Sequence, residues 1–207
     1  MELIRSAMFG GDQRLNHFRL EKAIQVVGLL ILANDRSADY YYINKLAYLA
    51  ERESLIQYNY PLFFDSLNNL PLGPIASKTK DKTYSMKSNF TREIGSFISA
   101  TDRNTLVITG EVTRDELSNS EISLILDVKK QADDYIKKSL KKFNGDRFAA
   151  VHDYVCRLPE YVQIKQTDDR QSLPIFYETI LSGAGYTESS IKEIIENINS
   201  SEMMPSV

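Results

Sequence analysis

Apolar residues recur at the spacing of an α-helix along most of this chain. A first helix is predicted over 18–33, and a second follows a polar break at 34–38. Ser37 or Asp39 can cap the N-terminus of the second helix. One face of that helix carries Ile43, Leu46, Ala47, Ala50 and Ser54. This face is expected to lie in the core.

The helical period stops between residues 59 and 77, where prolines and asparagines are concentrated. The apolar run 62–64, followed by Leu67, predicts a short strand or a packed loop. Gly73-Pro74 predicts a turn that orients the next helix. That helix is expected over 75–86, with Pro74 in its first turn.

The next part of the chain predicts one β-hairpin and two helices. Apolar residues on both sides of the polar segment 101–104 predict the hairpin within 93–112. The segment Ser118-Asn119-Ser120-Glu121 predicts a capping box at the start of a long helix that ends at Gly145. The buried side of this helix is expected to consist of Ile122, Ile125, Leu126, Ala132, Tyr135, Ile136, Leu140 and Phe143. A following helix has an apolar stripe of Phe148, Val151, His152 and Val155 and is expected to stop at Leu158-Pro159.

The predicted fold is mainly α, a compact helical domain with a small antiparallel β-hairpin or sheet. With 43% hydrophobic residues, the 207-residue chain has enough apolar surface for one core. We expect one domain over 18–200, an N-terminal extension at 1–17 and a flexible tail at 201–207. The longest apolar run, Val26 to Ala33, is too short to cross a membrane, and the N-terminus lacks a secretory signal pattern. Together with a single cysteine, these features predict a cytoplasmic protein.

The sequence contains no arrangement that indicates catalysis, a cofactor or a metal site. His152 and Cys156 lie four residues apart on one helix face. Nucleophilic catalysis would need an exposed thiolate with an oriented base, and zinc would need more ligands. We interpret His152 as a core or edge histidine. The chain is therefore predicted not to be an enzyme and to bind no cofactor.

Three short motifs follow one another between residues 43 and 77. They contain Lys45, Tyr48 and Leu49, then Pro61 and Leu62, then Gly73 and Pro74. This order resembles the Panacea domain of SocA-like antitoxins, in which a Lys-Leu-x-Tyr-Leu/Phe-Ala helix precedes a Pro-Leu element and a Gly-Pro turn. The family usually has an aromatic residue before Gly-Pro, where this chain has Leu72.

The resemblance extends into the second half of the chain and covers most of 18–198. It includes His152 and the later Pro159-Glu160 element. In the last two helices it implies Pro174 at a first helical position and Thr187 as a cap.

The resemblance implies an antitoxin of a toxin–antitoxin system that neutralises a cognate protein toxin by direct binding. Two mechanisms are compatible with the family: occlusion of a functional site of the toxin, or delivery of the toxin to a ClpXP-type protease. Because Panacea domains pair with unrelated toxin folds, the class of toxin does not follow from this chain.

Two charged stretches and one aromatic run are candidates for partner contact. The basic stretch includes Lys78, Lys80, Lys82 and Tyr84, and the acidic terminal helix includes Glu188, Glu193 and Glu196. Either could complement a toxin of opposite charge. The successive residues Tyr40, Tyr41 and Tyr42 must point in three directions, so at least one is expected to be exposed.

Two other functions are compatible with these residues. A phage or mobile-element accessory protein that binds a host factor is one, since phage-borne relatives occur in the family. The other is a nucleic-acid-binding module that uses Lys78, Lys80, Lys82 and Lys87 with Tyr84 and Phe90. The net charge of −3 argues against nucleic acid.

Overall fold

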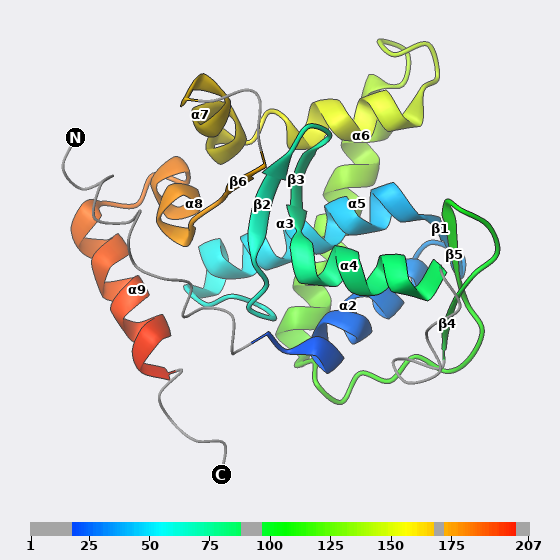
Figure 1. Ribbon diagram of the computed structural model, residues 1–207, viewed down its shortest axis with the longest axis horizontal. Coiled ribbons are helices and arrows are strands. Elements are labelled where there is room, and N and C mark those ends of the chain that lie inside the picture. The colour runs from blue at the N-terminus through cyan, green and yellow to red at the C-terminus, as the bar shows by residue number, and fades with distance from the viewer. Residues whose placement is uncertain (1–17, 88–96, 168–171, 202–207) are drawn as a thin grey trace.

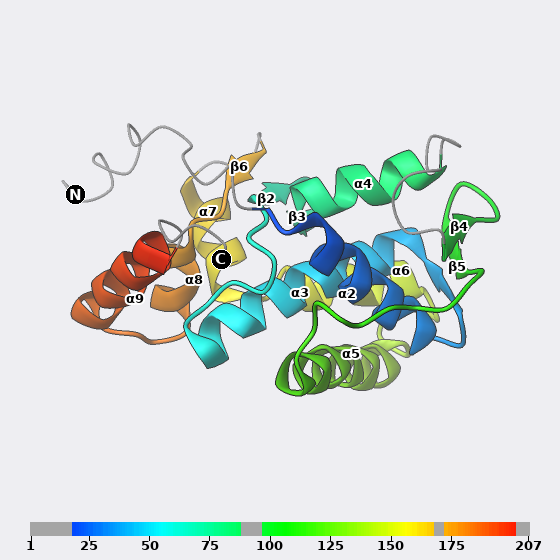
Figure 2. The same ribbon diagram turned by 90° about the horizontal axis from the view of Figure 1, so that it is seen from below.

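Helix α3 (Tyr40–Tyr58) forms the centre of the molecule. The computed structural model describes residues 18–87, 97–167 and 172–201. The helices that pack on α3 include α2 (Leu20–Leu32), α4 (Ser77–Lys87) and α5 (Asn119–Ser139). Figure 2 shows α4 on one side of α3 and α5 on the other. Residues 42–52 of α3 are all buried, because neighbouring elements cover this helix on every side.

The start of α3 follows from its sequence. The side chain of Asp39 accepts a hydrogen bond from the backbone N–H of Tyr42 (3.0 Å), which confirms Asp39 as the predicted cap. The predicted core face of α3 is buried in full. The helix ends at Tyr58, and the next residue, Asn59, adopts a left-handed conformation (φ 56°).

The Gly73-Pro74 prediction is wrong in one respect. These residues belong to strand β3 (Gly73–Ala76), which pairs antiparallel with β2 (Leu67–Leu70) to form a hairpin, and α4 begins only at Ser77. Pro74 therefore lies in a strand and not in a first helical turn. Proline has no backbone N–H to donate. The sheet tolerates Pro74 because β3 is an edge strand with a neighbouring strand on one side only.

Strand β6 (Leu173–Pro174) completes this sheet on the other side of β2, in the order β3-β2-β6. Pro174 pairs with Asn68, which corrects its expected place in a first helical turn. The following helix, α8 (Tyr177–Gly183), begins three residues later. The N–H of Ile175 donates to the carbonyl of Leu67 (2.8 Å), which holds the chain extended beyond Pro174.

A second antiparallel sheet lies at the end of the molecule opposite α8 (Figure 1). Its order is β1 (Ser37–Asp39), β5 (Thr105–Ile108) and β4 (Ile98–Ala100). The β4–β5 pair confirms the predicted hairpin with its 101–104 loop, in which Asp102 accepts from the N–H groups of Asn104 and Thr105. The beginning of the predicted segment, residues 93–96, lies outside the described residues.

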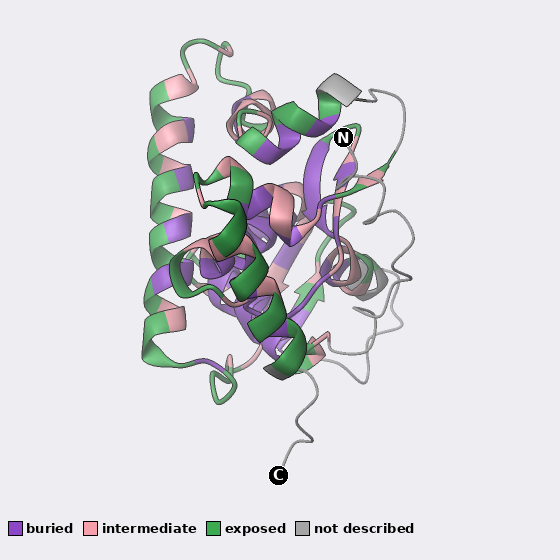
Figure 3. Cartoon of the chain, turned by 90° about the vertical axis from the view of Figure 1, so that its left-hand side faces the viewer, coloured by how far each residue is buried: buried purple, intermediate pink, exposed green. Residues whose placement is uncertain are grey.

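Helix α5 has the predicted capping box, in which Ser118 and Glu121 each accept from the backbone of the other. The helix ends at Ser139, and turns lead on to Gly145, whose N–H donates to the carbonyl of Leu140 (2.9 Å). One predicted core residue is wrong, since the side chain of Leu126 is 39% exposed. It follows Ile125 by one residue and so points about 100° away from the buried face. That face, visible in Figure 3, consists of Leu124, Ile125, Val128, Ala132 and Ile136.

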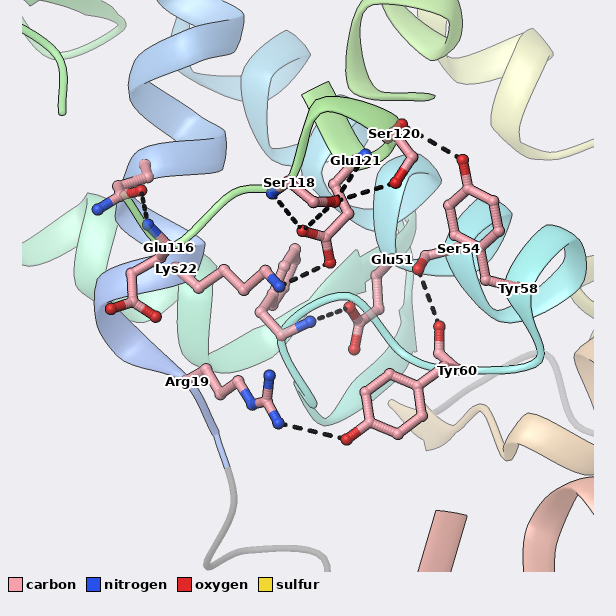
Figure 4. A network of polar contacts seen from close by, with 12 residues as sticks. Arg19, Lys22, Glu51, Ser54, Tyr58, Tyr60, Glu116, Ser118, Ser120 and Glu121 are labelled. Atoms are coloured by element: carbon pink, nitrogen blue, oxygen red, sulfur yellow. Dashed lines mark hydrogen bonds and ion pairs between the residues drawn. The ribbon is translucent and has the colours of Figure 1, made fainter. Parts of the chain in front are cut away.

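The capping box also connects α5 to the rest of the core (Figure 4). Glu121 accepts from the Nζ of Lys22 on α2 (2.6 Å), and its own pKa is lowered by this bond and by the N–H of Ser118, against the effect of burial. The hydroxyl of Tyr58 donates to the carbonyl of Ser120 (3.3 Å). The start of α5 is thus fixed to both α2 and α3.

The remaining helices are α6 (Arg147–Val155), α7 (Pro159–Thr167) and α9 (Glu188–Ser201). Pro159 begins α7, whereas the sequence predicted only the end of a helix there. Thr187 caps α9 as expected, because its hydroxyl accepts from the N–H of Ser190 (3.3 Å). Helix α9 packs on α8 at the edge of the molecule (Figure 1). None of the helices over the described residues is long and apolar enough to span a membrane.

Candidate functional site

Several residues of the predicted motifs meet around α3, although they are far apart in the sequence. The Nζ of Lys45 donates to the carbonyl of Pro74 (2.9 Å). The hydroxyl of Tyr48 donates to Oε1 of Glu160 (2.8 Å). Helix α3 therefore holds both the β2–β3 hairpin and α7 through buried polar contacts. We call the first contact region the hairpin joint (Lys45, Gly73, Pro74) and the second the α7 joint (Tyr48, Arg52, Glu160).

The hairpin joint contains a buried lysine. Lys45 is 2% exposed, and its amine lies 5.0 Å from the ring centre of Tyr41. Burial lowers the pKa of Lys45 to about 7, and the nearby Cys156 raises it only in part. The amine therefore changes its charge near neutral pH, an unusual property for a lysine.

Gly73 is required at this joint for two reasons. Its φ of +91° lies in the region that disfavours a side chain. A Cβ at this position would also lie 3.1 Å from Cγ2 of Val155 and 3.4 Å from both the sulfur of Cys156 and the Nζ of Lys45. The hairpin can approach α3 and α6 this closely only with glycine at position 73.

The α7 joint is a buried ion pair. Glu160 is 0% exposed, and its carboxylate accepts from Nε of Arg52 (2.6 Å) as well as from Tyr48. Burial alone would lower the pKa of Arg52, but the hydrogen bond and charge of Glu160 reverse this, and the pKa is raised. Burial and the same carboxylate raise the pKa of Tyr48. The three side chains satisfy one another and fix α7 on α3.

Among the other predicted motif residues, Pro159 is exposed at the start of α7 and His152 is half-buried, whereas three are part of the core. Leu49 and Leu62 are buried, as is Pro61. The loop that contains Pro61 and Leu62 is held by Glu51, whose carboxylate accepts from the N–H groups of Phe63 (2.8 Å) and Asp65 (3.0 Å). Burial raises the pKa of Glu51 to about 8, although these N–H donors favour the ionised form.

Sequence reasoning did not identify Glu51, Arg52 or Asp65. Asp65 caps α4 from outside the helix, since it accepts from the N–H groups of Lys78 and Thr79. One signal was available for the first two residues. Glu51 and Arg52 directly follow the apolar positions of α3, and the segments on both sides of this helix are also apolar. Charged residues in such a setting are expected to be buried and paired.

His152 and Cys156 do meet, with 3.4 Å between Nε2 and the sulfur. Burial and the amines of Lys45 and Lys165 lower the pKa of His152. Burial raises the pKa of the Cys156 thiol. Both shifts oppose a thiolate–imidazolium pair, so the contact lacks the electrostatics of an activated nucleophile. The described residues also contain no cluster of three metal-binding side chains.

The predicted partner-binding residues lie on two separate surfaces. On α4, Tyr84 is 60% exposed and Lys80 pairs with Asp81 (3.0 Å), while the amine of Lys78 lies over the ring of Phe18. Lys82 is half-buried on the same helix. On α9, the exposed carboxylates are those of Glu188, Glu193 and Glu196. Figures 1 and 2 show the two helices well apart, so the two groups do not form one surface.

The three successive tyrosines contact three different elements, as their spacing predicts. The hydroxyl of Tyr40 donates to the carbonyl of Lys80, and that of Tyr41 donates to the carbonyl of Leu72. The hydroxyl of Tyr42 donates to the carboxylate of Asp133. Tyr42 is buried, and the other two are half-buried rather than fully exposed.

An open depression of about 550 Å³ lies away from all of these residues, between Leu32, Arg36 and the segment 110–115. None of the predicted motif residues lines it. The polar residues around α3 therefore serve contacts between elements and do not surround this depression.

One comparison with known proteins gives a match. The family model described as "Antitoxin SocA-like, Panacea domain" matches residues 43–147. The matched range covers about half of the chain and contains Lys45, Tyr48, Gly73 and Pro74, whereas Glu160 and the rest of α7 lie beyond it. No curated protein and no solved structure matches the chain.

Proposed function

The chain belongs to the SocA-like antitoxin family with a Panacea domain, and from this membership we propose that it neutralises a protein toxin by binding it directly in the cytoplasm. The family match is the observation that carries this proposal. It runs from α3 through the β2–β3 hairpin and α4 to the start of α6, and so includes the hairpin joint.

Neutralisation is proposed to occur by binding and without catalysis. The buried polar side chains of α3 are occupied by contacts to the hairpin, the 62–65 loop and α7. The His152–Cys156 pair is poorly suited to nucleophilic attack for the electrostatic reasons above. Occlusion of the toxin by the surface of this chain is the mechanism that needs neither a catalytic group nor a third protein.

Co-expression with the protein encoded next to this chain tests the proposal. The neighbour alone should stop bacterial growth, and this chain should restore growth and co-purify with the neighbour at a fixed stoichiometry. A neighbour that is harmless, or growth that is not restored, would contradict the proposal. In that case, binding of a host factor by a phage or mobile-element protein becomes the better account.

The same experiment in a host without ClpX separates occlusion from delivery to a protease. Occlusion predicts that rescue of growth persists and that the level of the neighbour is unchanged. Delivery predicts that rescue is lost and that the neighbour accumulates.

A labelled 20-nucleotide single strand, added to the purified chain at low salt, tests the nucleic-acid alternative, for which strong salt-dependent binding is expected.

A further inference from the structure

Exposed apolar side chains gather where the tip of the β2–β3 hairpin meets α6. Leu72 at the tip is 52% exposed, and Phe148 in the first turn of α6 is 46% exposed. Tyr41 joins them: its ring centre lies 4.3 Å from that of Phe148, and its hydroxyl donates to the carbonyl of Leu72 (2.9 Å). His152 stacks on Phe148 one turn further along α6. We call these four residues the tip surface.

Phe148 corrects the sequence prediction, which placed it in the buried stripe of α6. Val151 and Val155 of that stripe are buried as expected, at 3% and 0% exposure. Phe148 instead leans on Tyr41 at the rim. The half-buried ring of Tyr41, the exposed ring of Phe148 and the exposed Leu72 together form an apolar patch of the kind that partner sites use.

The tip surface is held rigidly from below by the hairpin joint. Lys45 binds the carbonyl of Pro74, and Gly73 packs against Val155 and Cys156. The hydroxyl of Tyr41 fixes the backbone of Leu72. A partner would therefore find Leu72 and Phe148 already in place and would lose little conformational entropy in ordering them.

The charge around the tip surface is positive. Burial and the amines of Lys45 and Lys165 lower the pKa of His152, and of the two amines only that of Lys165 is exposed. Directly after His152, the carboxylate of Asp153 pairs with both Arg157 (2.9 Å) and Lys142 (3.2 Å), so these three side chains carry a net positive charge. Lys165 is exposed on α7 and can reach a partner. A partner with carboxylates beside an apolar anchor fits this surface.

Resting on the proposed function, we propose that the tip surface is where this chain binds its toxin, and that it takes an acidic segment of the toxin with an apolar side chain at its centre. The aromatic and aliphatic side chains would form the centre of the interface, and Lys165 would lie at its rim. Nucleic acid fits less well, since the centre of the surface is apolar.

The probe is the tagged protein encoded next to this chain, co-expressed with each variant. Leu72→Asp and Phe148→Asp place a carboxylate in the centre of the tip surface, and Leu126→Asp is the matched control on the far face of α5. Each tip variant should weaken the affinity, measured by interferometry, at least tenfold and should fail to restore growth. The control should stay within about twofold of the wild type. Circular dichroism and thermal melts should show that all three variants are folded.

Lys165→Glu tests the rim, with Lys138→Glu on α5 as its control. We expect a severalfold loss of affinity for Lys165→Glu and a weaker dependence of affinity on salt, because a rim charge acts through long-range attraction. The control should change neither quantity. Loss of affinity at Glu188, Glu193 and Glu196 or at Lys80 and Tyr84, with the tip variants unaffected, would overturn the assignment of the tip surface.

The two proposals fail in different ways. If the wild-type chain neither binds the neighbour nor restores growth, the proposed function is wrong and this inference falls with it. If the wild type does both and the folded tip variants match it within twofold, only the tip surface is wrong. Binding of the labelled single strand that Leu72→Asp abolishes would overturn the choice of a protein partner.

Discussion

Lys45 and Arg52 are buried basic residues two turns apart on the same helix, yet their pKa values shift in opposite directions. Arg52 is paired with the fully buried carboxylate of Glu160, and its pKa is raised. Lys45 meets a carbonyl and an aromatic ring, and burial lowers its pKa to about 7. The α7 joint is thus a permanent ion pair, whereas the hairpin joint holds a cation that can lose its charge.

This difference indicates what each joint contributes. An ion pair with all its hydrogen bonds satisfied fixes one helix on another, and breaking it on one side leaves an uncompensated charge. A lysine bound to a single carbonyl holds a short hairpin close to α3 at a lower electrostatic cost, because it need not stay charged. The hairpin joint supports the exposed residues at the hairpin tip, whereas the side chains of the α7 joint are all buried.

Removal of Glu160 should have the largest effect on stability. Glu160→Ala leaves Arg52 buried without its main partner, and we expect a loss of about 3–5 kcal/mol in the free energy of unfolding, measured with urea. Glu53→Ala is the control, since Glu53 contacts the same guanidinium (2.6 Å) from a side chain that is 25% exposed. The control should cost at most about 1 kcal/mol. Equal losses in the two variants would show that the α7 joint is not the main stabilising contact of Arg52.

Substitution of Gly73 should have the next largest effect. Gly73→Ala combines an unfavourable positive φ with a methyl group 3.1 Å from Val155, and we expect a loss of about 2–3 kcal/mol. Gly145 offers a matched control, because its φ is +84° but no atom lies within 4 Å of the position that a Cβ would take there. Gly145→Ala should cost about 1 kcal/mol, from backbone strain alone. Thermal melts of the two variants separate close packing from strain, and equal losses would contradict the close approach at the hairpin joint.

The Lys45 substitution should have the smallest effect at neutral pH but a distinct pH dependence. The folded-state pKa of about 7 lies below the ordinary value of 10.5, so the unfolded chain binds more protons between these two values. The contribution of Lys45 to stability therefore rises with pH from about 7 to about 10, with a slope of up to about 1.4 kcal/mol per pH unit. Lys45→Met removes this rise.

Urea unfolding of the wild type and of Lys45→Met from pH 6.5 to pH 9.5 measures this difference. The stability of the wild type relative to the variant should increase across the range. Lys138→Met, which removes an exposed lysine of α5, controls for the loss of one charge. A constant difference between wild type and Lys45→Met would mean that Lys45 keeps its charge in the folded protein, as Arg52 does.

Local patterns predicted much of the fold because the contacts that decide it are local. The cap at Asp39, the capping box at Ser118 and the hairpin loop at 101–104 each depend on residues a few positions apart. The places of Gly73-Pro74 and Pro174 were not predictable in this way. Their chemistry suits a helix start as well as a strand edge. The choice is made by pairing with β2, which lies just before Gly73-Pro74 but about 105 residues before Pro174.

The candidate site was predictable in its members but not in its contacts. The resemblance to the family singled out Lys45, Gly73 and Pro74, which do meet. It also singled out Tyr48 and Glu160, but a hydrogen bond across 112 residues has no local signal in the sequence. The exposure of Leu72 and Phe148 depends on how the hairpin meets α6, so the surface that we propose for toxin binding was not foreseeable from the periodicity of the chain.

The most direct test of toxin binding at the tip surface is amide hydrogen exchange of the chain, alone and in complex with the protein encoded next to it. We predict that exchange slows on binding in two segments, 70–73 at the hairpin tip and 147–152 at the start of α6. Exchange in α5 and α9 should be unchanged. Slower exchange confined to α4 or to α9, with the hairpin tip unaffected, would contradict binding at the tip surface.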